Sequence, residues 1–239
     1  MGISQSALNL FRDCPYAYKL KYLDRVEGIY FSNDAMDTGG YVHDAIDMYY
    51  RNHFLQEGTS DDILYHTYTN LKNIWDTTLS INDFKKAYTC LQHHSEWEYS
   101  NINKGIRTQP LTEVEIEACN LYGFIDYVDL EKQQVIDWKT NSYATLSYTY
   151  RVQASIYKIL FEAKFNMKLK YFHFFFLYPN TWRIVKYGDA KQERVDTEVN
   201  ALLEQLNLSL ENREFEKNPR TNSWCKSCPY KLYCKVMKY

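Results

Sequence analysis

The spacing of apolar residues changes once along this chain, and that change limits the folds open to it. Up to about residue 104, apolar residues recur every three or four positions, which predicts helices over 4–25 (in two pieces), 38–54, 61–79 and 82–102, with a loop over 26–37. From residue 111 the pattern alternates and predicts strands over 111–118, 121–130 and 134–139. A helix over 150–165, strands over 170–178 and 182–187, and a helix over 195–211 follow. This order predicts an α/β fold, with a mixed central sheet flanked by helices.

Composition excludes several classes of protein. The 239 residues contain no internal repeat, and we expect a single domain over 1–239 with a helical insertion at about 55–105. A formal charge of -2 excludes a globally basic nucleic-acid binder but leaves room for a local basic groove. No apolar run reaches the ~18 residues of a membrane span, and the first residues do not resemble a secretory signal. A cytoplasmic location without membrane contact is therefore expected.

Four of the six cysteines suggest a metal site. Cys225, Cys228 and Cys234 form a C-x2-C-x5-C run in the tail, within a segment of about 218–239. Cys14 is the best candidate for a fourth ligand. Tetrahedral zinc and a [4Fe-4S] cluster both accept four thiolates, and unbound buried thiols are the remaining alternative. The other two cysteines, Cys90 and Cys119, lie in apolar-patterned segments and are expected to be core thiols.

Two acidic residues and a lysine are placed to meet on the predicted sheet. Asp126 lies on the strand over 121–130, and Asp137 and Lys139 lie on the next strand, after a short polar turn. Because side chains alternate along a strand, Asp137 and Lys139 share one face, whereas Ile136 and Trp138 point into the core. Neighbouring carboxylates favour a hard cation such as Mg²⁺ or Mn²⁺, which can polarise a phosphoryl oxygen. The alternative is an ordinary solvent-facing Asp–Lys pair.

These residues belong to an ordered set of motifs that resembles the PD-(D/E)XK nuclease superfamily, and within it the RecB/AddB-like branch that carries an iron–sulfur cluster. That branch includes the AddB nuclease domain and the CRISPR spacer-acquisition exonuclease. The matching segments cover roughly residues 3–25, 38–50, 111–160 and 222–236. The motifs are the N-terminal cysteine helix around Cys14, Gly39-Gly40-Tyr41-Val42-His43, Gly123-x-x-Asp126, Ile136-Asp137-x-Lys139-Thr140, Gln153-Ala154-x-x-Tyr157 and the C-x2-C-x5-C tail.

The resemblance implies a restriction-endonuclease-like fold and a role for each matching residue. It implies metal ligation by His43, Asp126, Asp137 and the carbonyl of Trp138, with Lys139 orienting the attacking water. It also implies that Gln153 and Tyr157 face the active site from one side of a helix. The implied cluster is [4Fe-4S], held by Cys14, Cys225, Cys228 and Cys234 as a staple between the chain ends. Glu113, Glu115 and Glu117 alternate outward, and a solvated face is preferred for them over a further acid at the metal.

The function predicted from these features is a Mg²⁺- or Mn²⁺-dependent deoxyribonuclease, acting as an exonuclease on single-stranded DNA or DNA ends. The basic tail, with Lys217, Arg220, Lys226, Lys231, Lys235 and Lys238, is a candidate DNA contact. A helicase, or a recombination or CRISPR-adaptation protein, is the expected kind of partner. Two alternatives remain: a non-catalytic DNA-binding or assembly module of a recombination or CRISPR-adaptation complex, and a zinc-stapled protein of unrelated function.

Overall fold

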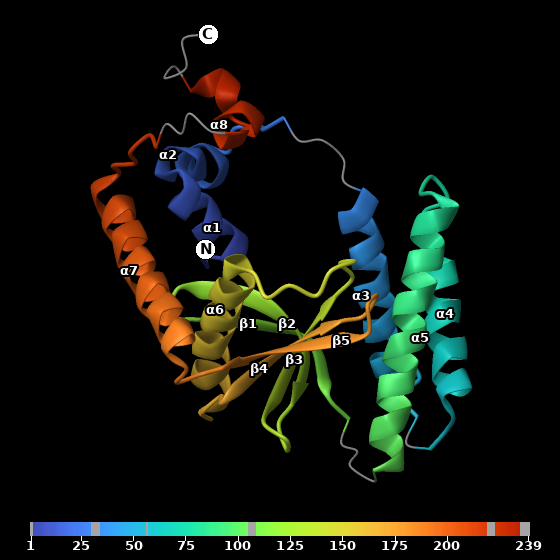
Figure 1. The fold of residues 1–239 in the computed structure, drawn as a ribbon. Coiled ribbons are helices and arrows are strands. Elements are labelled where there is room, and N and C mark those ends of the chain that lie inside the picture. Colours follow the sequence, from blue (N-terminus) through green and yellow to red (C-terminus); the bar gives the residue numbers. More distant parts are fainter. Residues whose placement is uncertain (1, 30–33, 56, 105–108, 219–222, 235–239) are drawn as a thin grey trace.

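The computed structural model describes residues 2–29, 34–55, 57–104, 109–218 and 223–234 of the chain. Its centre is a five-stranded mixed sheet in which the strands lie in chain order (Figure 1). Neighbouring strands run antiparallel, except that β3 and β4 run parallel and are connected through helix α6. The strands are β1 (Leu111–Ala118), β2 (Leu121–Asp129), β3 (Gln134–Lys139), β4 (Tyr171–Phe176) and β5 (Thr181–Lys186). The predicted mixed α/β sheet is confirmed.

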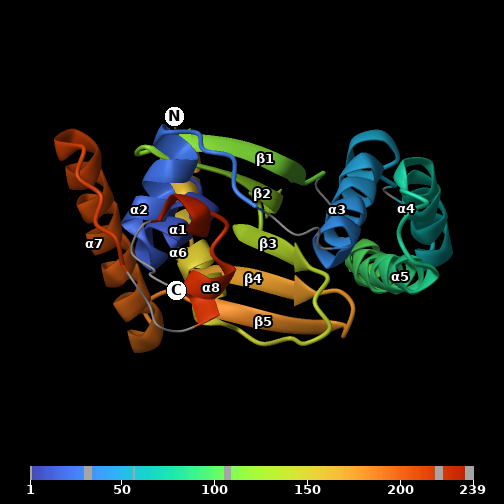
Figure 2. The same cartoon turned by 90° about the horizontal axis from the view of Figure 1, so that it is seen from above.

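Helices cover both faces of this sheet (Figures 1 and 2). One hydrophobic core joins the sheet to α1, α6 and α7, and a second joins its other face to α3, α4 and α5. The second layer is the predicted helical insertion together with the helix before it. The helices are α1 (Gln5–Asp13), α3 (Asp34–Asn52), α4 (Ser60–Ile74), α5 (Ile81–Asn103), α6 (Tyr148–Phe165) and α7 (Ala190–Asn212).

Strand β3 divides its side chains between the two cores, as predicted. Ile136 and Trp138 are buried in the core formed with α3–α5, and Val135 is buried in the core formed with α6. Because side chains alternate, Asp137 and Lys139 lie on the α6 side with Val135. The two faces of one short strand therefore serve different purposes at this point of the sheet.

The hairpin of β2 and β3 fixes which acids oppose each other. Its paired residues run from Asp129↔Gln134 to Tyr127↔Ile136. One step further in this register places Asp126 opposite Asp137, just beyond the last pair of the ladder. The predicted juxtaposition across the hairpin is confirmed at the level of the backbone.

The β1–β2 hairpin turns tightly and corrects one expectation. Cys119 and Asn120 adopt positive φ angles of 52° and 61°, the conformation of a two-residue turn that follows the twist of its strands. Cys119 is consequently exposed, so its prediction as a core thiol was wrong, whereas Cys90 is fully buried as expected. The apolar pattern around Cys119 belongs to the flanking strands and not to the turn itself.

Segments near the two ends of the described chain meet. Helices α1 and α2 (Pro15–Tyr18) and the π-helical turn η1 (Lys19–Leu23) lie against the tail that carries α8 (Ser223–Ser227) and the short 3₁₀ turn η2 (Lys231–Tyr233) (Figures 1 and 2). The Tyr16 amide donates to the Glu216 carbonyl at 3.0 Å, and the Asn218 side chain donates to the Asp13 carbonyl at 3.3 Å. These bonds connect segments about two hundred residues apart.

Two further results concern the start of helix α3 and the residues of the basic tail. Helix α3 begins at Asp34 and not near Thr38; Met36, which the prediction left outside the helix, is 73% exposed and so adds no apolar spacing to reveal it. Of the basic tail residues, Arg220, Lys235 and Lys238 lie outside the described residues. Within the described part of the chain, no helix combines the length and apolar character needed to cross a membrane.

Candidate active site

A pocket of about 500 Å³ opens where α3 passes the ends of β1, β2 and β3. It is lined by residues of the predicted histidine motif on α3 and by residues of the predicted acidic core on the sheet. The lining comprises Met36, Gly39, Gly40, His43, Asp44, Glu113, Asp126, Trp138, Lys139, Thr140 and Asn141. Segments that are far apart in the sequence therefore contribute to one cavity.

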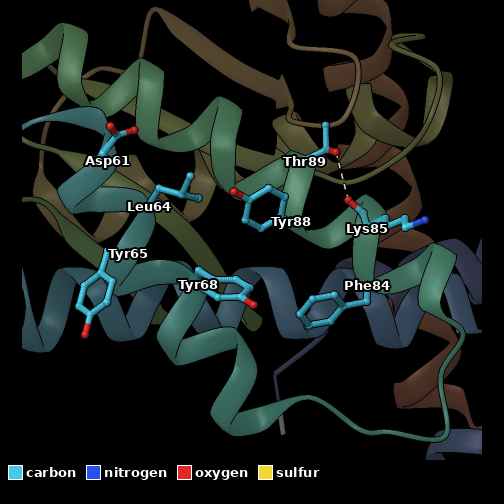
Figure 3. Close-up of a pocket in the computed structure, with 8 residues that line it drawn as sticks. All are labelled: Asp61, Leu64, Tyr65, Tyr68, Phe84, Lys85, Tyr88 and Thr89. Carbon is cyan, nitrogen blue, oxygen red and sulfur yellow. Dashed lines mark hydrogen bonds between the residues drawn. The ribbon is translucent and has the colours of Figure 1, made fainter.

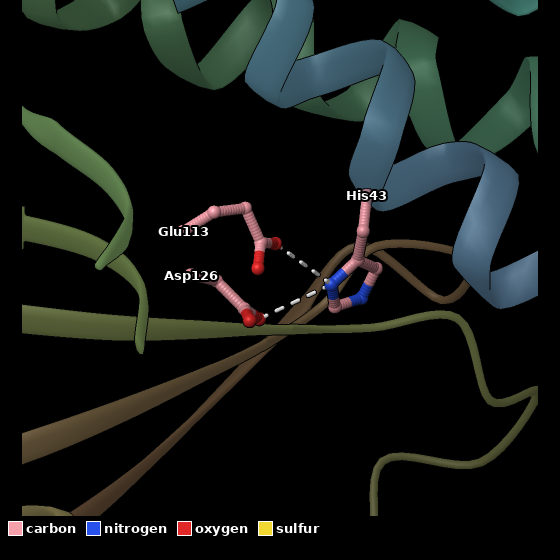
Figure 4. Close-up of side chains that lie close together, drawn as sticks. All are labelled: His43, Glu113 and Asp126. Atoms are coloured by element: carbon pink, nitrogen blue, oxygen red, sulfur yellow. Dashed lines mark ion pairs between the residues drawn. The ribbon is translucent and has the colours of Figure 1, made fainter. Parts of the chain in front are cut away.

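Three ligand-type side chains converge at this pocket (Figure 4). The Nδ1 atom of His43 lies 3.4 Å from an Asp126 oxygen and 3.9 Å from a Glu113 oxygen. The donor atoms of the three residues all lie within 4.8 Å of one another. One imidazole and two carboxylates at this spacing are the donors that Mg²⁺ and, still more, Mn²⁺ accept. The prediction of His43 and Asp126 as neighbours is confirmed; their role as ligands stays a prediction.

Glu113 corrects the expected solvated face of β1. It lies opposite Asp126 in the register that pairs Thr112 with Tyr127 and Val114 with Ile125, and α3 covers it. Its φ angle is 44°, a left-handed conformation that costs a non-glycine residue of order 1–3 kcal/mol. Strict alternation therefore missed Glu113. Counting back from the two-residue turn, which pairs Ala118 with Leu121, would have found it.

Where β2 and β3 separate, the Asp126 side chain takes the place of a main-chain hydrogen-bond acceptor. Its Oδ2 atom accepts the backbone N–H of Trp138 at 2.7 Å. An unpaired buried N–H costs about 1–3 kcal/mol, so this carboxylate stabilises the opening of the hairpin as well as facing the pocket. The position of the acid is thus fixed by the backbone of the neighbouring strand.

Asp137 occupies the other side of β3, where both of its oxygens have partners. Oδ2 forms an ion pair with Lys139 Nζ at 2.5 Å, and Oδ1 accepts from the Gln153 amide at 2.5 Å. Lys139 Nζ also lies 5.1 Å from the centre of the Tyr150 ring, within the range of a cation–π contact. The predicted grouping of Asp137, Lys139 and Gln153 is confirmed. Asp137 does not belong to the three-residue donor group at the pocket.

The second residue of the helix motif packs in the same region. The Tyr157 hydroxyl interacts with the Gln153 side chain, and burial strongly raises the pKa of this phenol, with the charges of Asp137 and Asp126 adding to the effect. A Cβ atom at Gly123 would lie 3.0 Å from the Tyr157 ring. The glycine of the predicted acidic motif therefore allows α6 to approach β2 closely.

Burial and clustered charge shift the pKa values of the site. Burial lowers the pKa of His43, but the nearby Asp126 carboxylate outweighs this and raises it to about 9. Burial raises the pKa of Glu113 to about 7, and the charge of Asp126 adds to that effect. Burial likewise raises the pKa of Asp137 to about 6, although Lys139 opposes the shift. Acids that resist ionisation in each other's company are stabilised as anions by a cation placed between them.

The cysteines of the two chain ends are neighbours without forming a tight group. Burial raises the pKa of the Cys228 thiol, and the thiols of Cys14, Cys225 and Cys234 add to the shift. Cys228 also packs against the small buried cluster that contains Cys14. Among the described residues, no three of these sulfur atoms lie within 4.8 Å of one another. The predicted proximity is therefore supported, but a compact ligand set is not.

A second, larger hollow lies away from these groups. It has a volume of about 740 Å³ and lies between α4 and α5, with four aromatic side chains along it: Tyr65, Tyr68, Phe84 and Tyr88 (Figure 3). Its only carboxylate is Asp61, and its lining includes no histidine or cysteine. Size alone would favour this hollow, but its chemistry does not, and the candidate active site remains the pocket beside His43.

A mixed sheet flanked by helices, with an imidazole, carboxylates and a lysine gathered where two strands separate, defines a restriction-endonuclease-like nuclease domain. The family model of the PD-(D/E)XK nuclease superfamily matches residues 2–235, and the chain belongs to this superfamily. Its members are in general metal-dependent nucleases.

Comparisons with solved structures and with curated proteins add little to this family assignment. A solved structure described as "Crystal structure of SSO0001" is 15% identical, with the match covering 87% of this chain and 100% of that chain. Its TM-score is 0.35, and at that value the likeness adds nothing to the assignment. No curated protein matches the chain.

Proposed function

We propose that this chain is a divalent-metal-dependent deoxyribonuclease that acts as an exonuclease on single strands or DNA ends. The observation that carries the proposal is the convergence of His43, Glu113 and Asp126 on one open pocket, which Lys139 also lines. A non-catalytic module has no need for carboxylates held so close together, because each raises the cost of ionising the others.

The donor set fits a hard divalent cation. It combines carboxylate oxygens with one imidazole, and it lies on the wall of a cavity and not in the packed core. His43, Asp126 and Glu113 would hold Mg²⁺ or Mn²⁺, and Asp137 and the Trp138 carbonyl would complete the ligands if Asp137 exchanged one of its present partners. When bound, the metal supplies charge stabilisation at the scissile phosphate and activates water.

The remaining residues would position the attacking water and the acids, and would stabilise charge on the phosphate. Lys139 would orient the attacking water and stabilise negative charge on the phosphate, and its ion pair with Asp137 keeps it protonated by raising its pKa against the effect of burial. Gln153 holds Asp137 in place through its amide, and Tyr157 supports Gln153. These roles agree with the resemblance to the RecB/AddB-like branch, from which the exonuclease mode is also taken.

A structural [4Fe-4S] cluster on Cys14, Cys225, Cys228 and Cys234 is part of the proposal. A zinc ion with four bonds of about 2.3 Å holds its sulfurs under about 4 Å apart. In a cubane each thiolate binds a different iron, which spaces the sulfurs more widely. Among the described residues, no three of these thiols lie as close together as a zinc ion would hold them. Anaerobically purified protein should be brown and absorb near ~400 nm, and Cys14→Ser should lose both the absorbance and thermal stability. A colourless protein containing zinc would reject the cluster.

The nuclease proposal is tested with end-labelled single strands, duplexes and closed circles, with and without Mg²⁺ or Mn²⁺. We expect strands with free ends to be shortened only when the metal is present, and we expect closed circles to stay intact. Glu113→Gln should reduce cleavage strongly, whereas Glu115→Gln, an exposed glutamate two residues along the same strand, is the matched control and should cleave like wild type. Lys139→Gln should abolish cleavage while DNA binding persists. Equal loss in both glutamate variants, or cleavage that survives Lys139→Gln, would reject the proposed site.

The biological setting is part of the same proposal. A cytoplasmic role in DNA repair, recombination or CRISPR adaptation, with a helicase or adaptation protein as partner, follows from the resemblance alone. Co-purification of the tagged chain from its native cells tests it, and a partner without any connection to DNA would reject it.

A further inference from the structure

The loop that joins β3 to α6 presents an aromatic ring to solvent beside the pocket. Tyr143 is 83% exposed, the highest value among the large hydrophobic side chains of the described residues. Two residues before it, Asn141 lines the pocket itself. Figure 1 shows this loop running from the end of β3, near α3, to the start of α6. An exposed ring at this position has no role in the core.

The backbone on both sides of Tyr143 is held in place. The Asn141 side chain accepts from the Tyr150 hydroxyl at 2.9 Å, and the Arg183 guanidinium donates to the Ala144 carbonyl at 2.9 Å. Ala144 and Leu146 also pack against the core beneath α6. The ring therefore projects from an anchored loop, which lowers the entropy lost when a ligand binds to it.

The surroundings of the loop favour a nucleic-acid strand as the ligand. Arg183 brings a positive charge to the loop on one side, and Lys139 brings another to the pocket on the other. Tyr150 connects the loop to Lys139, because its ring contacts Lys139 and its hydroxyl donates to Asn141. Cations with an interposed exposed aromatic ring match the alternation of phosphates and bases along a single strand.

We propose that Tyr143 is a stacking platform for one unpaired base next to the phosphate that enters the pocket. This inference rests on the proposed nuclease function and adds to it a determinant of strand preference. Only a base turned out of a duplex offers its face to the ring, so Tyr143 selects single strands and frayed ends over paired DNA.

The test measures binding of a fluorescent oligothymidine strand and of a matched duplex, with Ca²⁺ in place of Mg²⁺ so that the DNA stays intact. Loss of one base stack costs about 1–3 kcal/mol, so Tyr143→Ala should weaken binding of the strand about 5- to 140-fold. Tyr143→Phe should bind like wild type, and binding of the duplex should be unchanged in both variants. A fluorescent 2-aminopurine base in the strand should be quenched by stacking in wild type and in Tyr143→Phe, and this quenching should be lost only in Tyr143→Ala.

The control is Tyr65→Ala, which removes another largely exposed ring, 65% exposed, from the α4–α5 hollow. Equal affinity of Tyr143→Ala and wild type for the strand, or a loss seen in Tyr65→Ala instead, overturns the stacking role while the nuclease proposal stands. A wild-type protein that neither binds nor cleaves DNA overturns the proposed function itself. Circular dichroism of each variant shows whether the fold is retained.

Discussion

Two adjacent glycines in the second turn of α3 provide a quantitative test of the pocket. A glycine in a helix interior is about 1 kcal/mol less favourable than alanine, so Gly39 and Gly40 together cost the helix about 2 kcal/mol. A Cβ atom at Gly40 would meet no atom within 4 Å, whereas one at Gly39 would lie 3.1 Å from the Thr140 hydroxyl. Close packing against Thr140 therefore explains why residue 39 has no side chain. At residue 40 nothing is close enough to exclude one, and we attribute this glycine to the open pocket that it lines.

We expect Gly40→Ala to stabilise the protein by about 1 kcal/mol, which corresponds to a rise in Tm of about 2–4 °C for a chain of this size. Gly39→Ala should gain less, or lose stability, because Thr140 must move. Gly40→Leu should fold but extend a side chain into the pocket and reduce cleavage. Urea and thermal unfolding, followed by the cleavage assay, measure both effects. A lower Tm in Gly40→Ala, or unchanged cleavage in Gly40→Leu, would refute this account of the pocket wall.

Three further outcomes follow from individual contacts. Asp126→Asn should abolish cleavage with little loss of stability, since its amide oxygen can still accept the Trp138 N–H, whereas Asp126→Ala should also lose about 1–3 kcal/mol in urea unfolding. Gly123→Ala should destabilise by about 1–3 kcal/mol in the same assay, because the added methyl group crowds the Tyr157 ring. Burial lowers the pKa of His94 to about 3, so the unfolded chain takes up its proton first. His94 should therefore cost about 1.4 kcal/mol of stability per pH unit as the pH falls from about 6.5 to about 3, a slope that His94→Gln should lack.

Much of the sheet could be predicted because its signals are local. The alternation on β3 places Ile136 and Trp138 in one core and Asp137 on the other face, and the structure agrees. The connection before β3 is four residues long (130–133), one more than predicted, and this length sets the register that brings Asp126 opposite Asp137. The division of side chains between the two faces needed only the side-chain period.

The errors have a different origin, because each depends either on tertiary packing or on backbone conformation. Glu113 follows the outward pattern of β1, yet α3 lies over that face, and nothing within the strand reports the helix. The early start of α3 leaves no apolar trace, because Met36 lines the pocket and does not pack in the core. The exposure of Cys119 depends on a positive φ angle, which no side-chain pattern encodes. Tertiary cover and backbone conformation therefore limit what local patterns can predict.

The same departure from a regular sheet explains why the candidate site forms where it does. If β2 and β3 stayed paired for one more residue, the Trp138 N–H would bond to main chain, and Asp126 would be one more cross-strand side chain. Because the carboxylate takes that bond itself, the strands separate, and one acid turns toward α3 while its partner turns toward α6. The acids thereby acquire different partners, an imidazole for Asp126 and an ammonium with an amide for Asp137. Two acids that would otherwise repel each other are thereby held at fixed, neighbouring positions before any ligand arrives, which is the preorganisation that the proposed metal-assisted hydrolysis would require.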